Sequence, residues 1–154
     1  MTESSGLPSY NKIVLASDGS EFAWNAAQHA LALAKQMNSE VVALFVVNPH
    51  EAFSAGIHAA EARAEMAAQG TRALRRIAEL ARSLQVSVRT DLLEGDPKTT
   101  LVEVAAQEGA DCLVVGSHGT SGLERALLGS VLEYCVRHAP CPVLVVRPRK
   151  LSNP

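Results

Sequence analysis

The chain has 154 residues, 47% of them hydrophobic, which suits one domain with one buried core. Its 16 acidic and 14 basic residues are interspersed and give a formal net charge of -2, so no face is built to hold a nucleic-acid backbone. No apolar run approaches the ~20 residues that span a bilayer, and no secretory signal pattern opens the sequence. We therefore expect a cytoplasmic protein that binds neither nucleic acid nor membrane.

Apolar runs of strand length alternate with longer segments of helical period along the chain. The run Glu40 to Val47 is almost continuously apolar, as is typical of a parallel strand buried on both faces. The run Val86 to Gly95 is the most polar, which predicts an edge strand. In chain order the sequence predicts a strand at Lys12 to Ser17, a helix at Glu21 to Met37, a strand at Glu40 to Val47, a loop at Asn48 to Gly56, a helix at His58 to Leu84, a strand at Val86 to Gly95, a helix at Lys98 to Glu108, a strand at Asp111 to Gly116, a helix at Ser130 to His138 and a strand at Pro142 to Pro148.

Strands that are separated by helices pair in parallel through right-handed crossovers. The predicted fold is therefore α/β, an open parallel five-stranded sheet with helices on both faces. Nothing marks a second domain, so we expect residues 1–154 to form one domain, with its core at about 10–147 and polar tails at 1–9 and 149–154. In such sheets ligands bind at the carboxyl ends of the strands, where the strand order reverses. The order 3-2-1-4-5 would bring the loops SDGSE and GSHGTSG, after the first and fourth strands, into one crevice.

The glycine-rich loop after the fourth strand has two interpretations. Gly116 ends a buried strand, and Gly119 and Gly122 permit positive φ or close backbone approach. Gly129-Ser130 stands at a helix N-terminus, where free N–H groups favour anions such as phosphates. The loop is neither a Walker A motif nor G-x-G-x-x-G. In the second interpretation the glycines only let the chain turn, while Ser130 and Glu133 form a capping box for their own helix.

Three side chains near these loops are equally ambiguous. Asp18 follows the first strand and is placed either to accept hydrogen bonds from ribose hydroxyls or to complement the dipole of the next helix, with Ser20 as another candidate cap. Ser17 beside it is open to both interpretations. His118 could work as an acid or base, hydrogen-bond a phosphate, or lie in solvent.

The three cysteines are Cys112, Cys135 and Cys141, an odd number without the spacing of a disulfide framework, which favours a reducing compartment. In the segment CVRHAPC, His138 joins two of them as a conceivable zinc cluster. A structural zinc site needs four ligands, so we expect ordinary core cysteines instead.

Five segments together resemble the universal stress protein family over about Tyr10 to Arg147. They are IVLASDGSE, VVALFVV, EGDP, GADCLVVGSHG and LLGSVLEYCVRHAPCPVLVVR. The last two carry the pattern G-x2-G-x9-G-[S/T] of members that bind ATP, here at Gly116, Gly119, Gly129 and Ser130. The resemblance implies a three-layer, Rossmann-like sheet of order 3-2-1-4-5, as in the adenine nucleotide alpha hydrolases.

The resemblance also implies a site and partners. It puts adenine against the backbone near Ala16 and Val46, ribose at Asp18, and phosphates on the two glycine segments. It further implies Mg²⁺ or Mn²⁺ on the phosphates and a homodimer paired through Pro142 to Arg147. The expected nucleotide-binding residues are Ala16, Ser17, Asp18, Val46, Val115, Gly116, Ser117, His118, Gly119, Thr120, Ser121, Gly129, Ser130 and Val131.

Several functions fit these residues. The first is a regulatory module that binds ATP with little or no turnover. The second is a weak ATPase or nucleotide hydrolase, against which stands the lack of a paired general base and nucleophile. The third is a dimeric interaction protein with a vestigial pocket. A flavodoxin-like FMN binder fits less well, because the first loop lacks a phosphate cradle rich in glycine and hydroxyl groups.

Overall fold

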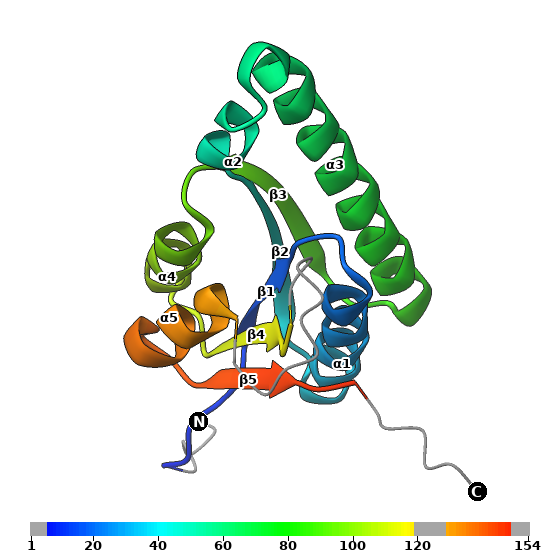
Figure 1. Cartoon of the computed structure of the whole chain (residues 1–154). Coiled ribbons are helices and arrows are strands. Elements are labelled where there is room, and N and C mark those ends of the chain that lie inside the picture. Colours follow the sequence, from blue (N-terminus) through cyan, green and yellow to red (C-terminus); the bar gives the residue numbers. More distant parts are fainter. Residues whose placement is uncertain (1–5, 119–128, 149–154) are drawn as a thin grey trace, which may run out of the picture.

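The fold alternates strands and helices as the sequence predicts, in a computed structural model that describes residues 6–118 and 129–148 (Figure 1). Most element boundaries fall within two residues of the predicted ones. The elements are β1 (Lys12–Ser17), α1 (Glu21–Met37), β2 (Glu40–Val47), α2 (Pro49–Phe53), the 3-10 helix η1 (Gly56–His58), α3 (Ala59–Leu84), β3 (Val88–Glu94), α4 (Pro97–Gln107), β4 (Cys112–Gly116), α5 (Ser130–His138) and β5 (Val143–Val146).

The segment after β2 differs from the prediction. It was expected as a loop, but it contains α2 and η1. Pro49 occupies the start of α2, where a missing N–H costs nothing, and the side chain of Asn48 accepts a hydrogen bond from the backbone of His50 at 3.0 Å. These local features stabilise a short helix that apolar periodicity alone does not reveal.

The sheet is fully parallel and has the order β3-β2-β1-β4-β5, which confirms the predicted order. β3 and β5 form its edges, so the most polar strand does lie at an edge. β1 is central, pairing with β2 on one side and with β4 on the other. The strand order therefore reverses between β1 and β4.

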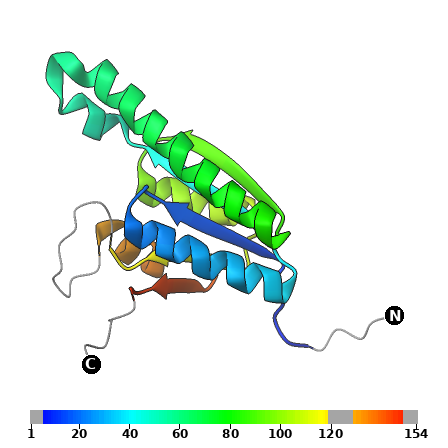
Figure 2. The same ribbon diagram turned by 90° about the vertical axis from the view of Figure 1, so that its right-hand side faces the viewer.

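The two faces of the sheet are covered by different helices, giving three layers (Figures 1 and 2). Alternate residues of each strand point to opposite faces, as the pleat requires. Ile13 and Leu15 of β1 pack in the cluster that contains α1 and α3, whereas Val14 and Ala16 pack in the cluster with α4 and α5. Both faces of the central strands are buried, which explains their continuous apolar runs.

Helix α3 lies close to the sheet because of Gly70. A Cβ at this position would come within 2.5 Å of the Phe45 ring and 2.6 Å of Leu92. Beyond this contact, α2, η1 and the start of α3 project past the carboxyl end of β2 (Figure 1). Within residues 6–118 and 129–148, no helix has both the length and the apolar character needed to cross a bilayer.

Candidate functional site

A cavity of about 420 Å³ opens at the carboxyl ends of β1, β2 and β4. It lies at the point where the strand order reverses, because β1 leads into α1 on one face and β4 leads towards α5 on the other. Of the fourteen residues expected to bind nucleotide, Gly119, Thr120 and Ser121 fall outside the described residues. The other eleven line the cavity: Ala16, Ser17, Asp18, Val46, Val115, Gly116, Ser117, His118, Gly129, Ser130 and Val131.

The turn between β1 and α1 fixes Asp18 at the edge of this cavity. Ser20 caps α1, its hydroxyl accepting a hydrogen bond from the backbone of Ala23 at 3.1 Å. The Asp18 carboxylate accepts one from the backbone of Ser20 at 3.0 Å, and Ser17 Oγ accepts one from Gly19 at 3.3 Å. Ser20 is therefore the cap of α1, whereas Asp18 stabilises the turn and faces the cavity.

The end of β4 packs against the first turn of α1 at Gly116. A Cβ on Gly116 would lie 3.0 Å from the carbonyl oxygen of Phe22 and 3.1 Å from its carbonyl carbon. Because these neighbours are backbone atoms, they cannot yield as a flexible side chain would. Packing against α1 therefore requires glycine at position 116, whether or not this residue also contacts a phosphate.

Two polar residues continue the chain from Gly116 into the cavity. Ser117 is 3% exposed, and its backbone N–H donates to the carbonyl of Val146 at 2.9 Å, which holds it beside β5. Its Oγ lies 2.8 Å from Nδ1 of His118. The His118 ring also lies 5.0 Å from the Phe22 ring, centroid to centroid, with a tilt of 41°. His118 is therefore held by two contacts and is not simply exposed to solvent.

The N-terminus of α5 differs from the predicted capping box. Gly129 is the N-cap and makes no side-chain hydrogen bond, while Ser130 is the first helical residue. The Glu133 carboxylate pairs with Arg137 at 3.0 Å, one turn further along the helix. No described side chain therefore caps the first turn of α5 where it meets the cavity, and the N–H groups of this turn give that end a partial positive charge.

Gly129 itself has an ordinary backbone conformation, with φ -57° and ψ 151°. Any residue can adopt these angles. No atom of the described residues lies within 4 Å of where its Cβ would be. Neither backbone conformation nor packing against the described residues therefore requires glycine here, and a side chain beside the cavity would meet none of their atoms.

The part of the cavity that lies under α2 and α3 is not predicted by the sequence patterns. Asn48 and Glu51 come from the end of β2 and from α2, and Met66 and Gln69 come from α3. No local motif marks these residues, because tertiary packing at Gly70 brings α3 to the cavity. The apolar part of the lining includes Leu44, Phe45, Val47, Leu101 and Leu132, in addition to Ala23 and Pro97.

The charges around the cavity are few. Among the described lining residues, Asp18 and Glu51 are acidic, His118 is titratable, and none is lysine or arginine. Within the same described part of the chain, no group of three or more histidine, cysteine or acidic side chains is arranged to hold a metal ion. Any positive charge at this surface therefore comes from the helix terminus, from His118 or from outside the described lining.

The three cysteines lie away from this chemistry. Cys112 and Cys135 are buried, Cys141 is half-buried, and all three thiols are free. Burial raises the pKa of the Cys135 thiol to about 11 and also raises those of Cys112 and Cys141. A raised pKa disfavours the reactive thiolate, so these residues act as small core side chains.

The sequence model of the Universal stress protein family matches residues 9–147 of the chain. The chain belongs to the universal stress protein family. A curated relative, Universal stress protein MJ0531 from Methanocaldococcus jannaschii, is 39% identical over 143 residues, which cover 92% of this chain and 84% of the relative.

Solved structures of similar proteins agree with this family. The structure of hypothetical protein MJ0577 matches with a TM-score of 0.80 and 30% identity, over 92% of this chain and 98% of that one. A universal stress protein in complex with cAMP matches with a TM-score of 0.68 and 26% identity, over 90% of this chain and 98% of that one. This universal stress protein therefore shares its Rossmann-like fold with a relative that binds an adenine nucleotide.

Proposed function

We propose that this universal stress protein is a cytoplasmic module that binds ATP, with little or no turnover, and regulates its partners through nucleotide occupancy. The observation that carries the proposal is the cavity at the ends of β1 and β4, where no described side chain caps the N-terminus of α5. Helix N-termini of this kind bind phosphate groups. The cavity volume of about 420 Å³ also falls within the usual range for small-molecule sites.

The nucleotide would lie across the reversal point of the sheet. Its adenine would pack against Ala16 and Val46, its ribose would hydrogen-bond to Asp18, and its phosphates would meet Gly116 to His118 and Gly129 to Val131. The space beside Gly129 supports this orientation of the nucleotide, because phosphate oxygens approach a backbone most closely where there is no side chain. The cAMP complex of a relative supports adenine as the base.

A divalent cation, Mg²⁺ or Mn²⁺, would accompany the phosphates. The described lining has two carboxylates and no lysine or arginine, so the negative charges of ATP need an external counterion. Hard cations of this kind bind chiefly to phosphate oxygens and water. The proposal assigns the cation no protein ligand.

Binding without rapid hydrolysis fits the contacts of His118. Its Nδ1 meets the Ser117 hydroxyl, whereas hydrolytic triads use a carboxylate to orient the histidine and stabilise its cation. The described contacts therefore support holding a nucleotide more than activating water.

Pairing through Pro142 to Arg147 would make the module a homodimer. β5 is an edge strand with β4 as its neighbour, and Val143, Leu144 and Val145 are only half-buried in the single chain. An apolar edge strand is normally covered. Sedimentation analysis of the wild type should give a dimer that Leu144→Lys weakens; a wild-type monomer at micromolar concentration would contradict this arrangement.

Thermal unfolding with ATP and Mg²⁺ tests the proposed function. A ligand at 100 times its Kd adds about 2.7 kcal/mol, or roughly 5–10 °C in the melting temperature of a protein of this size. Gly129→Val should abolish this gain, because its side chain enters the space assigned to phosphate, while lowering intrinsic stability by no more than about 1 kcal/mol. Ala32→Val, on the exposed side of α1, should keep the full gain and serves as control.

Two results would overturn the proposal. The absence of any shift with millimolar ATP would favour a dimeric interaction protein with a vestigial pocket. Rapid phosphate release that His118→Ala abolishes would instead favour the nucleotide hydrolase.

A further inference from the structure

His118 is the described lining side chain that can become a cation. Two acidic side chains, Asp18 and Glu51, line the cavity with it. A bound nucleotide would add several more negative charges. Histidine side chains exchange a proton between pH 5 and 8, so the charge of this surface can change within the physiological range.

The contact between His118 and Ser117 suits both protonation states of the ring. Ser117 Oγ lies 2.8 Å from His118 Nδ1, and a hydroxyl can either donate or accept a hydrogen bond. With a neutral ring, the hydroxyl donates to Nδ1. With a protonated ring, Nδ1–H donates to the hydroxyl oxygen. Because Ser117 is 3% exposed and fixed by its backbone bond to Val146, it keeps the ring in place in either state.

Phe22 adds a second contact that holds the His118 ring. Its ring centroid is 5.0 Å from that of His118. The two rings are tilted by 41° to each other, and this contact helps to hold the imidazole in place.

We propose that His118 takes up a proton as the nucleotide binds, so that the affinity for ATP increases as the pH falls from 8.0 to 5.5. This inference rests on the proposed function and adds a form of regulation to the same site. The protonated ring would donate from Nε2 to a phosphate oxygen while Nδ1 remains bonded to Ser117. Such a charge-assisted hydrogen bond is about twice as strong as a neutral one.

The fixed charges around the cavity act on the ring with and without nucleotide, so proton uptake on binding would come from the negative charge of the nucleotide itself. The carboxylates of Asp18 and Glu51 share the cavity and attract a protonated ring. Among the described residues, the elements around the cavity carry further charges. Glu21 in the first turn of α1 pairs with Arg76 at 3.5 Å, and Glu133 on α5 pairs with Arg137 at 3.0 Å. Arg147 follows β5, and its carbonyl accepts a hydrogen bond from Asn25. Arg76 and Arg137 are each paired with one of these carboxylates, whereas the cation of Arg147 would oppose protonation.

Calorimetric titration with ATP and Mg²⁺ tests this inference. We would compare the wild type, His118→Gln and the control His29→Gln, which removes an exposed histidine of α1. Affinities are measured at pH 5.5 and 8.0, and the protons taken up on binding are counted at pH 7.0 in two buffers of different ionisation enthalpy. The protonation of ATP itself is common to all three proteins and cancels in their comparison.

Between pH 8.0 and 5.5 the affinity of the wild type should rise about tenfold more than that of His118→Gln, a difference of about 1.4 kcal/mol. Proton uptake attributable to the protein should be present in the wild type and in His29→Gln and absent in His118→Gln. Parallel pH profiles for the wild type and His118→Gln would overturn the inference and leave the proposed function standing. Failure of the wild type to bind ATP at both pH values would overturn both.

A second measurement uses only the wild type, so it does not depend on whether His118→Gln folds correctly. In the wild type at pH 7, the ring nitrogen resonances of His118 should shift towards the protonated form when ATP and Mg²⁺ are added. If these resonances show that the His118 ring keeps the same protonation state when ATP is added, the inference is overturned without any substitution.

Discussion

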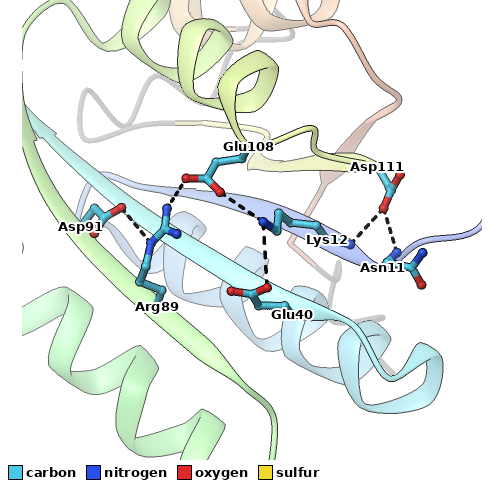
Figure 3. Close-up of polar contacts among 7 residues, drawn as sticks. All are labelled: Asn11, Lys12, Glu40, Arg89, Asp91, Glu108 and Asp111. Carbon is cyan, nitrogen blue, oxygen red and sulfur yellow. Dashed lines mark hydrogen bonds and ion pairs between the residues drawn. The ribbon is translucent and has the colours of Figure 1, made fainter.

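The two ends of the sheet use polar residues in opposite ways. At the amino end, charged side chains from β1, β2, β3 and the end of α4 pair with one another (Figure 3). At the carboxyl end, the polar residues surround a cavity, and their described hydrogen bonds fix turns of the backbone and the His118 ring. The same sheet therefore carries a closed charge network at one end and an open pocket at the other.

The network at the amino end centres on Glu108, the C-cap residue of α4. Its carboxylate contacts the Lys12 ammonium at 3.2 Å and also the Arg89 guanidinium. Lys12 lies 4.0 Å from Glu40, and Arg89 lies 3.3 Å from Asp91. These pairs join α4 to three neighbouring strands, β1, β2 and β3.

Asp111 completes the amino end through the backbone. Its carboxylate accepts hydrogen bonds from the N–H groups of Asn11 and Lys12, at 2.8 and 3.0 Å, and so fixes the start of β1 beside β4 (Figure 3). Each described charge of this network has a partner inside the protein. The contrast indicates that the amino end contributes to stability, whereas the open space and the few charges at the carboxyl end suit a ligand.

The largest expected effect concerns the two glycines that flank the pocket. Gly116→Val should lower the free energy of unfolding by about 1–3 kcal/mol, because its Cβ would press on the backbone of Phe22. Gly129→Val should lower it by no more than about 1 kcal/mol, because its side chain enters open space. Denaturation by urea, followed by circular dichroism, measures both.

Gly116→Ala tests whether the loss of stability comes from the tight contact at the Cβ position or from the larger side chain of valine. It places only a Cβ at the tight contact and should show an intermediate loss. Equal stability of Gly116→Val and Gly129→Val would contradict the assignment of a packing role to one glycine and a ligand-facing role to the other.

A smaller effect is expected from Glu108→Gln at the amino end. Hydrogen bonds from Arg89 first, and then from Lys12, hold the pKa of the Glu108 carboxyl below its ordinary value of 4.5. A carboxyl whose pKa is lowered by folding stabilises the protein above the pKa of the unfolded state, and this contribution disappears as the pH falls through the lowered value. The variant should melt about 2–4 °C below the wild type at pH 7.

The pH dependence gives the decisive comparison for the network. The difference in melting temperature between wild type and Glu108→Gln should shrink as the pH falls below 4.5, because the wild-type carboxyl is then protonated as well. The gain from ATP at pH 7 should be the same in both proteins. A constant difference between pH 7 and 3 would show that the charge of Glu108 contributes nothing, and a lost ATP gain would show that the two ends are coupled.

Much of the pocket was predictable because it is built from strand ends. The boundaries of β1, α1, β2 and α5 agree with the sequence prediction, since each has a clear apolar period and a polar or glycine boundary. The carboxyl ends of parallel strands meet at one edge, so the residues after β1 and β4 could be expected to lie together. The interpretation of Ser130 and Glu133 as a capping box was wrong. A Ser130 cap would place the first helical residue at Val131, but α5 already begins at Ser130, with Gly129 as its N-cap.

The sequence by itself determined the alternation of strands and helices, and with it the end of the sheet at which polar loops gather. Its local patterns suffice for this because periodicity and turn chemistry are properties of neighbouring residues. Only the tertiary structure decided which distant residues share a surface. Gly70 brings Met66 and Gln69 of α3 to the pocket, and Gly116 proves to be needed by the backbone of α1. Those contacts depend on distances between elements, which no spacing along the chain contains.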